Sequence, residues 1–234
     1  MATDGEEGWR IEFFNHDPSN ISQPLFDTPI LTVPALAQTR VNLYGMQVQG
    51  RTEQWSVRLR GLLKPQAKSA EWEFSLVVVG RAKLYIDRNL VIDLWDNQQP
   101  GGTFYNQGTT EVLGKFAVVE GKSHEVEVLY NNISPLRGNA PADQTAVRLG
   151  GAPVVDEEEE MEAAEVAAKA ADIAVVVVGL NHDRESEGHD RTTLVLPGWT
   201  NELRVVRRVL KANPKTIVVN QSVSKFSMTS CLHH

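Results

Sequence analysis

The chain has 234 residues, 41% of them hydrophobic and 23% charged, and this composition excludes a disordered or fibrous protein and favours one large or two small globular domains. The net charge is −7, with no basic cluster, so no nucleic-acid or membrane partner is expected. No apolar run approaches the roughly 20 residues that span a bilayer, the N-terminus is unlike a signal peptide, and the single cysteine, Cys231, excludes an intramolecular disulfide.

Residues 8–135 are predicted to form an antiparallel β-sandwich. In WSVRLRGLL, Trp55, Val57 and Leu59 alternate with polar residues, which indicates a strand with one buried face. EWEFSLVVV and HEVEVLYNN predict further strands, and RAKLYIDRNLVIDLW predicts two strands that meet in a tight turn at residues 87–89. Short strands between clusters of Gly, Pro and Asn are typical of a sandwich.

The composition changes after the sandwich. Residues 136–155 hold glycine and proline at the density of a linker, and residues 156–222 have the pattern of a partial α/β domain. The predicted fold class is therefore an α+β chain in two parts, an antiparallel sandwich followed by a βαβ unit.

The α/β part is predicted as helix, strand, long loop, helix and strand. Asp156 is expected to cap an acidic helix start, and IAVVVVG is expected to be a buried strand of a parallel sheet. A second helix over residues 200–212 ends at Asn213-Pro214, and TIVVNQS follows as a strand. With only two strands, this part is expected to expose apolar surface.

The connection between Gly179 and Thr200 is about twenty residues long, where such loops usually take 2–6. It leaves the carboxyl end of a parallel strand, where open α/β sheets place ligands. Its segment ESEGHDR offers Glu185 and Glu187 as carboxylates that could donate and accept protons, which suits glycosidic bond cleavage. A plain solvated loop explains the same residues equally well.

Other chemistries fit the loop less well. It has neither of the glycine patterns that cradle phosphates. His182 and His189 do not have the HExxH spacing of a helical zinc site and are expected to face solvent. Ser186 lies between two glutamates and lacks the glycine-flanked elbow of a serine nucleophile.

Residues 170–222 resemble the C-terminal α/β domain of family 3 glycoside hydrolases, in the branch of fungal β-glucosidases. The resemblance lies in the strand AVVVVGL, the loop E-x-E-G-x-D-R, the LPG before the helix and the segment NP-x-T-x-V-V-NQS. It implies that Glu187 is the catalytic acid/base, with Glu185 as the alternative if the register differs. It also implies hydrolysis of terminal, non-reducing β-D-glucosyl residues with retention, on a β-glucoside or a short β-glucan oligosaccharide, without a cofactor or metal.

The first part of the chain resembles the PA-fourteen sandwich, which that branch carries as an insert. GWRIEFFN, WSVRLRGLL and GRAKLYIDRNLVIDLW follow its strand order. The calcium-binding members use adjacent aspartates, which this chain lacks, and Arg88 replaces a glycine of the family turn. Trp55, Trp72 and Trp95 could stack on sugars, although tryptophans in sandwiches more often fill the core.

The resemblance also implies that other parts of the enzyme are missing. The family's nucleophile is an aspartate on a separate barrel, so the isolated chain is expected to be inactive. Residues 223–234 depart from the family pattern and are expected to be an aberrant tail, such as a retained intron would encode. The alternative function is a non-catalytic carbohydrate-binding or interaction module built on the sandwich.

Overall fold

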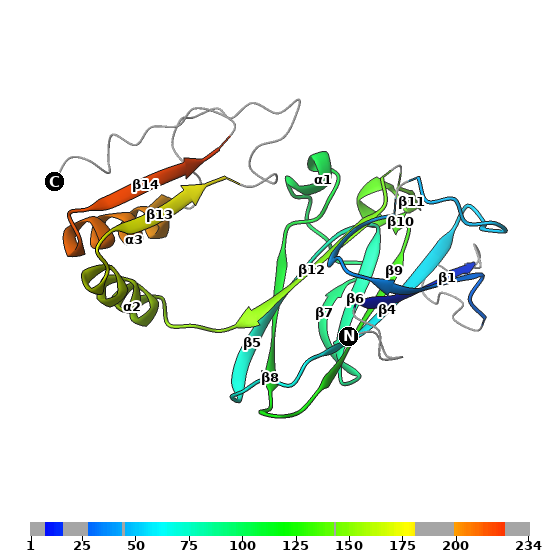
Figure 1. Cartoon of the computed structure of the whole chain (residues 1–234). Helices are drawn as coiled ribbons and strands as arrows, with labels where there is room; N and C mark the ends of the chain where they lie inside the picture. The colour runs from blue at the N-terminus through cyan, green and yellow to red at the C-terminus, as the bar shows by residue number, and fades with distance from the viewer. Residues whose placement is uncertain (1–7, 16–27, 44, 143, 181–198, 223–234) are drawn as a thin grey trace. The chain divides into compact units, whose positions relative to one another are not determined.

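The computed structural model describes residues 8–15, 28–43, 45–142, 144–180 and 199–222 (Figure 1). The chain divides into two compact units, Met1–Val154 and Val155–His234. The first is an antiparallel β-sandwich and the second a partial α/β domain, which confirms the predicted fold class. None of the described helices is long and apolar enough to cross a membrane.

Two large antiparallel sheets make up most of the described part of the sandwich, beside the short pair β10-β11. The larger has the order β2-β1-β4-β9-β6-β7 and the smaller the order β3-β12-β5-β8. The larger sheet consists of β1 (Trp9–Asn15), β2 (Leu31–Leu36), β4 (Trp55–Leu63), β6 (Arg81–Ile86), β7 (Asn89–Leu94) and β9 (His124–Asn131). The smaller consists of β3 (Arg40–Asn42), β5 (Ala70–Val79), β8 (Val112–Val118) and β12 (Ala146–Pro153). Short elements connect them: α1 (Thr103–Asn106), β10 (Ile133–Ser134), η1 (Pro135–Arg137) and β11 (Ala140–Pro141).

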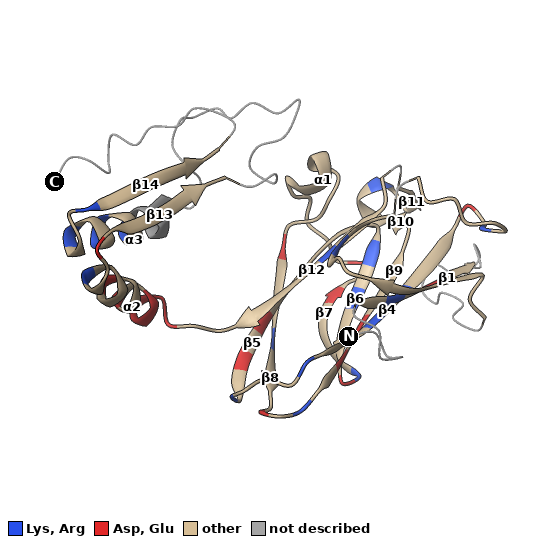
Figure 2. Ribbon diagram, in the orientation of Figure 1, with Lys and Arg blue, Asp and Glu red and all other residues tan. Residues whose placement is uncertain are grey.

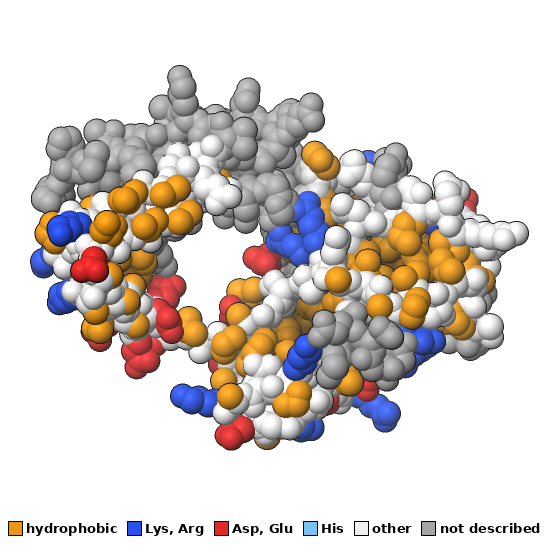
Figure 3. Space-filling view, viewed as in Figure 1, with side chains coloured by type: hydrophobic (Ala, Val, Ile, Leu, Met, Phe, Trp, Pro, Cys, Tyr) orange, Lys and Arg blue, Asp and Glu red, His pale blue; other side chains and the backbone are white. Residues whose placement is uncertain are grey.

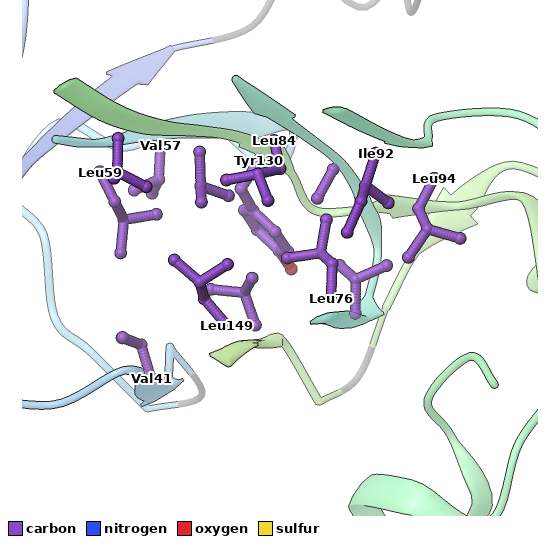
Figure 4. Packing of buried hydrophobic residues seen from close by; sticks show 14 of the residues in the cluster. Val41, Val57, Leu59, Leu76, Leu84, Ile92, Leu94, Tyr130 and Leu149 are labelled. Atoms are coloured by element: carbon purple, nitrogen blue, oxygen red, sulfur yellow. The ribbon is translucent and has the colours of Figure 1, made fainter. Parts of the chain in front are cut away.

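The core of the sandwich lies between the two sheets, around Tyr130 (Figure 4). The Tyr130 ring is fully buried, and its hydroxyl donates a hydrogen bond of 2.7 Å to the carbonyl oxygen of Val79. Trp55, Val57 and Leu59 all point into this core, which confirms the inward face predicted from their alternation. The hydroxyl bond explains how a polar aromatic residue is held at the centre of an apolar cluster.

The opposite face of β4 carries arginines that surround one carboxylate. Glu12 of β1 is buried and accepts bonds from Arg58 at 2.8 Å, Arg60 at 3.1 Å and Arg10 at 3.1 Å. Burial by itself raises the pKa of Glu12, but the bonds to Arg58 and Arg10 outweigh it, so the pKa is lowered. The polar half of the WSVRLRGLL alternation therefore forms an ion cluster that joins β1 to β4.

The structure differs from the linker expected over residues 136–155, because β12 occupies part of it. This strand pairs with β5 from Ala146, opposite Val79, to Pro153, opposite Trp72. A Cβ atom at Gly151 would lie 2.7 Å from the Phe74 ring, so this glycine makes room for a core side chain. The glycines of this segment therefore allow β12 to pack closely against the side chains of β5.

The turn between β6 and β7 lies where the sequence predicts it. Its two residues, Asp87 and Arg88, have φ angles of 48° and 67°, the left-handed values of a type I′ hairpin turn. Arg88 adopts this conformation although it has a Cβ atom, which costs about 1 kcal/mol relative to glycine. The replacement of the family's glycine by Arg88 therefore leaves the turn mildly strained.

The second unit contains α2 (Glu157–Ala170), β13 (Ala174–Gly179), α3 (Trp199–Ala212) and β14 (Thr216–Gln221). The strands β13 and β14 are parallel, as predicted for a βαβ unit. One side of this two-stranded sheet packs against the helices through Ala168, Ala174 and Val209. Asp156 caps α2 by accepting from the backbone N–H groups of Glu158 and Glu159, which confirms the predicted cap.

The other side of the two-stranded sheet is apolar and exposed. Figure 3 shows hydrophobic side chains in a row over β13 and β14. Val175, Val177, Ile217 and Val219 are 40–59% exposed there. This confirms the prediction that the α/β part exposes apolar surface.

Candidate functional site

The two parallel strands of the second unit end together and define the edge from which the long loop departs. Gly179, the last residue of β13, is paired with Gln221, the last residue of β14. A Cβ atom at Gly179 would lie 1.9 Å from the carbonyl oxygen of Gln221, so this position requires glycine. The same oxygen accepts a bond of 3.1 Å from the N–H of Leu180. The loop therefore begins at the carboxyl ends of both strands, where α/β sheets place ligands.

Helix α3, which follows the loop, is tied to α2 by ion pairs. Arg204 lies 2.7 Å from Glu158, and Arg208 contacts both Glu158 and Glu165. The hydrogen bond to Arg208 lowers the pKa of Glu165. Figure 2 shows the acidic start of α2, which includes Glu158, in red, and basic positions of α3 in blue. The acidic run, which the sequence explained only as a helix start, also orients the helix after the loop.

Asn213 joins three elements at the opposite end of the sheet, where β13 and β14 begin. Its buried side-chain amide donates 2.9 Å bonds to the carbonyl oxygens of Ala168 and Ala171, at the end of α2. Its side-chain oxygen accepts a 2.8 Å bond from the N–H of Lys215, just before β14. The sequence predicted Asn213-Pro214 only as a helix stop, because the contacts to α2 are about forty residues away along the chain and leave no local signal.

The candidate acid/base residues lie outside the described residues. Glu187 and Glu185 belong to residues 181–198, as do His182, Ser186 and His189, and their roles stay predictions. Cys231 and the rest of residues 223–234 are also outside. In the described ranges, no group of three His, Cys, Asp or Glu residues could hold a metal ion.

The sandwich carries a groove of about 470 Å³, lined by residues of both sheets. Trp72 of β5 and Trp9 of β1 are partly buried in its walls. By contrast, Trp55 and Trp95 are only 4% and 5% exposed, as expected for core tryptophans. Trp72 packs against the core and is only partly buried, because it also lines the groove. No sequence pattern singled out Trp9.

Comparisons with known proteins all point to one family, the family 3 glycosyl hydrolases. The profile of the glycosyl hydrolase family 3 C-terminal domain matches residues 25–234. The beta-glucosidase of Kluyveromyces marxianus is 35% identical over 225 residues, which is 94% of this chain and 26% of that protein. A probable beta-glucosidase I of Aspergillus clavatus is 30% identical over 234 residues, which is 96% of this chain and 26% of that protein.

A solved structure extends the similarity to three dimensions. The crystal structure of the Kluyveromyces marxianus beta-glucosidase in complex with glucose matches with a TM-score of 0.78 at 28% identity. The match covers 95% of this chain and 25% of that chain, and so includes both units. The chain thus spans about a quarter of the length of the relatives it matches.

Proposed function

Because the chain belongs to glycosyl hydrolase family 3, we propose that it is the acid/base-bearing part of a β-glucosidase. The observation that carries the proposal is the position of the long loop. Residues 181–198 come after β13, whose carboxyl end is paired with that of β14, and they contain the two glutamates. We assign the acid/base to Glu187, with Glu185 as the alternative, and the sandwich to a PA-fourteen-like insert.

The substrate we propose is a β-glucoside or a short β-glucan oligosaccharide, cleaved at its terminal, non-reducing glucosyl residue. In a retaining mechanism, protonated Glu187 donates its proton to the glycosidic oxygen as the bond to the anomeric carbon breaks. A second carboxylate forms a bond to that carbon and holds the glycosyl group. Glu187, now ionised, then takes a proton from water, which attacks the anomeric carbon and releases glucose.

The second carboxylate must lie about 5–5.5 Å from the first in such a mechanism. We propose that the part of the relatives that this chain does not span supplies it. The isolated chain is accordingly expected to give no measurable turnover, because protonation without a nucleophile cannot form the glycosyl intermediate.

The experiment uses a chimera in which this chain replaces the matching quarter of the Kluyveromyces marxianus β-glucosidase. In Glu187→Gln, hydrolysis of cellobiose should fall by roughly 10²–10⁴-fold, because general acid catalysis is lost. Cleavage of 2,4-dinitrophenyl β-glucoside should lose much less in the first step, since that leaving group needs no proton. Glu185→Gln is the matched control and should retain activity on both. Loss on cellobiose in Glu185→Gln alone would transfer the role to Glu185, and loss in neither would refute the proposal.

A further inference from the structure

Three polar residues follow the apolar part of β14, and they are Asn220, Gln221 and Ser222. The strand reads TIVVNQ, so the change from apolar to polar side chains falls at its carboxyl end. Figure 1 shows that β13 ends on the same side, and residues 181–198 follow β13 there. Polar side chains at this edge lie where α/β sheets bind their ligands.

The register of the two strands places Asn220 on the side of the sheet that the helices cover. Asn220 is paired with Val178, and Val178 lies two residues after Val176, which packs against the helices. Gln221 is paired with Gly179 and therefore lies on the opposite side. Asn220 is nevertheless exposed, so its amide faces a space that the helices of this unit leave open at the carboxyl edge.

A neighbouring hydroxyl group holds the amide of Asn220. Its side-chain N–H group donates a hydrogen bond of 3.0 Å to the hydroxyl of Ser222, which lies two residues further along the chain. In the described part of the chain, the Asn220 side chain makes no other hydrogen bond. An amide has two N–H donors and a carbonyl acceptor, so one donor and the acceptor remain for a ligand.

The chemistry of this edge suits a neutral ligand with hydroxyl groups. Leu180, Asn220, Gln221 and Ser222 are all uncharged, and they offer no partner for the charge of a phosphate or carboxylate. A sugar hydroxyl both donates and accepts, and two neighbouring hydroxyl groups can therefore pair with both sides of an amide.

The reaction proposed above decides which part of the substrate meets this edge. The acid/base protonates the oxygen that joins the glucosyl residue to the leaving group, whereas the nucleophile attacks the opposite face of the glucosyl ring. A side chain at the edge from which the acid/base loop leaves is therefore on the side of the leaving group.

We propose that Asn220 binds the leaving group of the substrate and favours leaving groups that carry hydroxyl groups, such as a second sugar. The inference rests on the proposed function and adds a specificity-determining residue on β14 to the acid/base on the loop. The Asn220 carbonyl oxygen accepts from one hydroxyl of the leaving sugar, and its free N–H donates to a neighbouring hydroxyl. Ser222 keeps the amide in the orientation that this contact needs.

The test uses the chimera with the Kluyveromyces marxianus β-glucosidase and compares kcat/KM for two substrates. Cellobiose has a sugar as its leaving group, and phenyl β-glucoside has an aromatic ring without further hydroxyl groups. In Asn220→Ala, kcat/KM for cellobiose should fall roughly tenfold, because two neutral hydrogen bonds to the leaving sugar are lost. For phenyl β-glucoside it should change by at most about twofold. Gln221→Ala is the matched control on the opposite side of the sheet and should leave both values unchanged.

A loss of structure would lower both values together, so the ratio between the two substrates is the decisive readout. Asn220→Thr repeats the test with a residue that suits a strand, should Asn220→Ala not fold, and the same selective loss is expected. An unaltered chimera that hydrolyses neither substrate would refute the proposed function, and the inference with it. Activity in the unaltered chimera, together with equal losses on both substrates or no loss on either, would overturn the role of Asn220 alone.

Discussion

The charge of Asp87 is expected to stabilise the sandwich, because it joins the turn between β6 and β7 to residues 122–125. One carboxylate oxygen accepts bonds from Lys122 at 2.8 Å and from the His124 ring at 2.9 Å, and the other accepts from the N–H of Glu125 at 2.9 Å. The second ring nitrogen of His124 accepts a 3.1 Å bond from the N–H of Val119, so the proton is assigned to the nitrogen that faces Asp87. The hairpin turn is thereby joined to the start of β9.

The size of the effect follows from the pKa of Asp87. Partial burial tends to raise this pKa, but the bonds from Lys122, His124 and Glu125 outweigh it and lower the pKa from 3.8 to about 2. At about 1.4 kcal/mol per pH unit, the difference corresponds to about 2.5 kcal/mol. Since the folded pKa lies below the unfolded one, this stabilisation is complete above about pH 4 and is lost as the pH falls from 3.8 towards 2.

The change that tests this is Asp87→Asn, which keeps a residue suited to the left-handed turn and removes the charge. Urea unfolding, followed by tryptophan fluorescence, should show a loss of about 2 kcal/mol at pH 7 that disappears near pH 2. Glu71→Gln is the control, because Glu71 pairs with Lys115 on the exposed surface and should cost less than about 1 kcal/mol. An equal loss from Asp87→Asn at pH 7 and at pH 2 would refute the electrostatic explanation.

Three further changes have expected outcomes. Arg88→Gly relieves the positive φ of the turn and should raise the free energy of unfolding by about 0.5–1 kcal/mol; a lower thermal midpoint would contradict this. Asn213→Ala removes three hydrogen bonds and should destabilise the second unit by about 2–3 kcal/mol, seen as faster amide hydrogen exchange in β13 and β14 with the sandwich unchanged. Val177→Thr, at an exposed position, should reduce binding of a hydrophobic dye without shifting the thermal midpoint; unchanged dye binding would show that this face is covered.

The strands of the sandwich core were predictable because their pattern is local. Alternation in WSVRLRGLL follows directly from the period of a strand, and Trp55, Val57 and Leu59 are buried as it indicates. The cap at Asp156 was equally predictable, since a capping side chain bonds to backbone groups two and three residues away.

Features that depend on distant partners were not predictable. Gly150 and Gly151 read as linker residues, although they accommodate Ser75 and Phe74 of a strand far away in the sequence. Trp72 and Trp55 are chemically alike, and only the packing of the two sheets places one at a groove and the other in the core. For residues 181–198, the chemistry of the side chains fits a solvated loop and a catalytic loop equally well. Only the resemblance of the motif around Glu187 to a known family favours the catalytic one.

Rescue by azide in the chimera tests the assignment of Glu187 most directly. In Glu187→Ala, with 2,4-dinitrophenyl β-glucoside as substrate, azide should restore turnover, because it attacks the glycosyl intermediate without needing a general base. The product should be β-glucosyl azide, since two displacements retain the configuration. Glu185→Ala should show no such rescue. No rescue in Glu187→Ala, or formation of the α-azide, would contradict an acid/base role for Glu187 in a retaining mechanism.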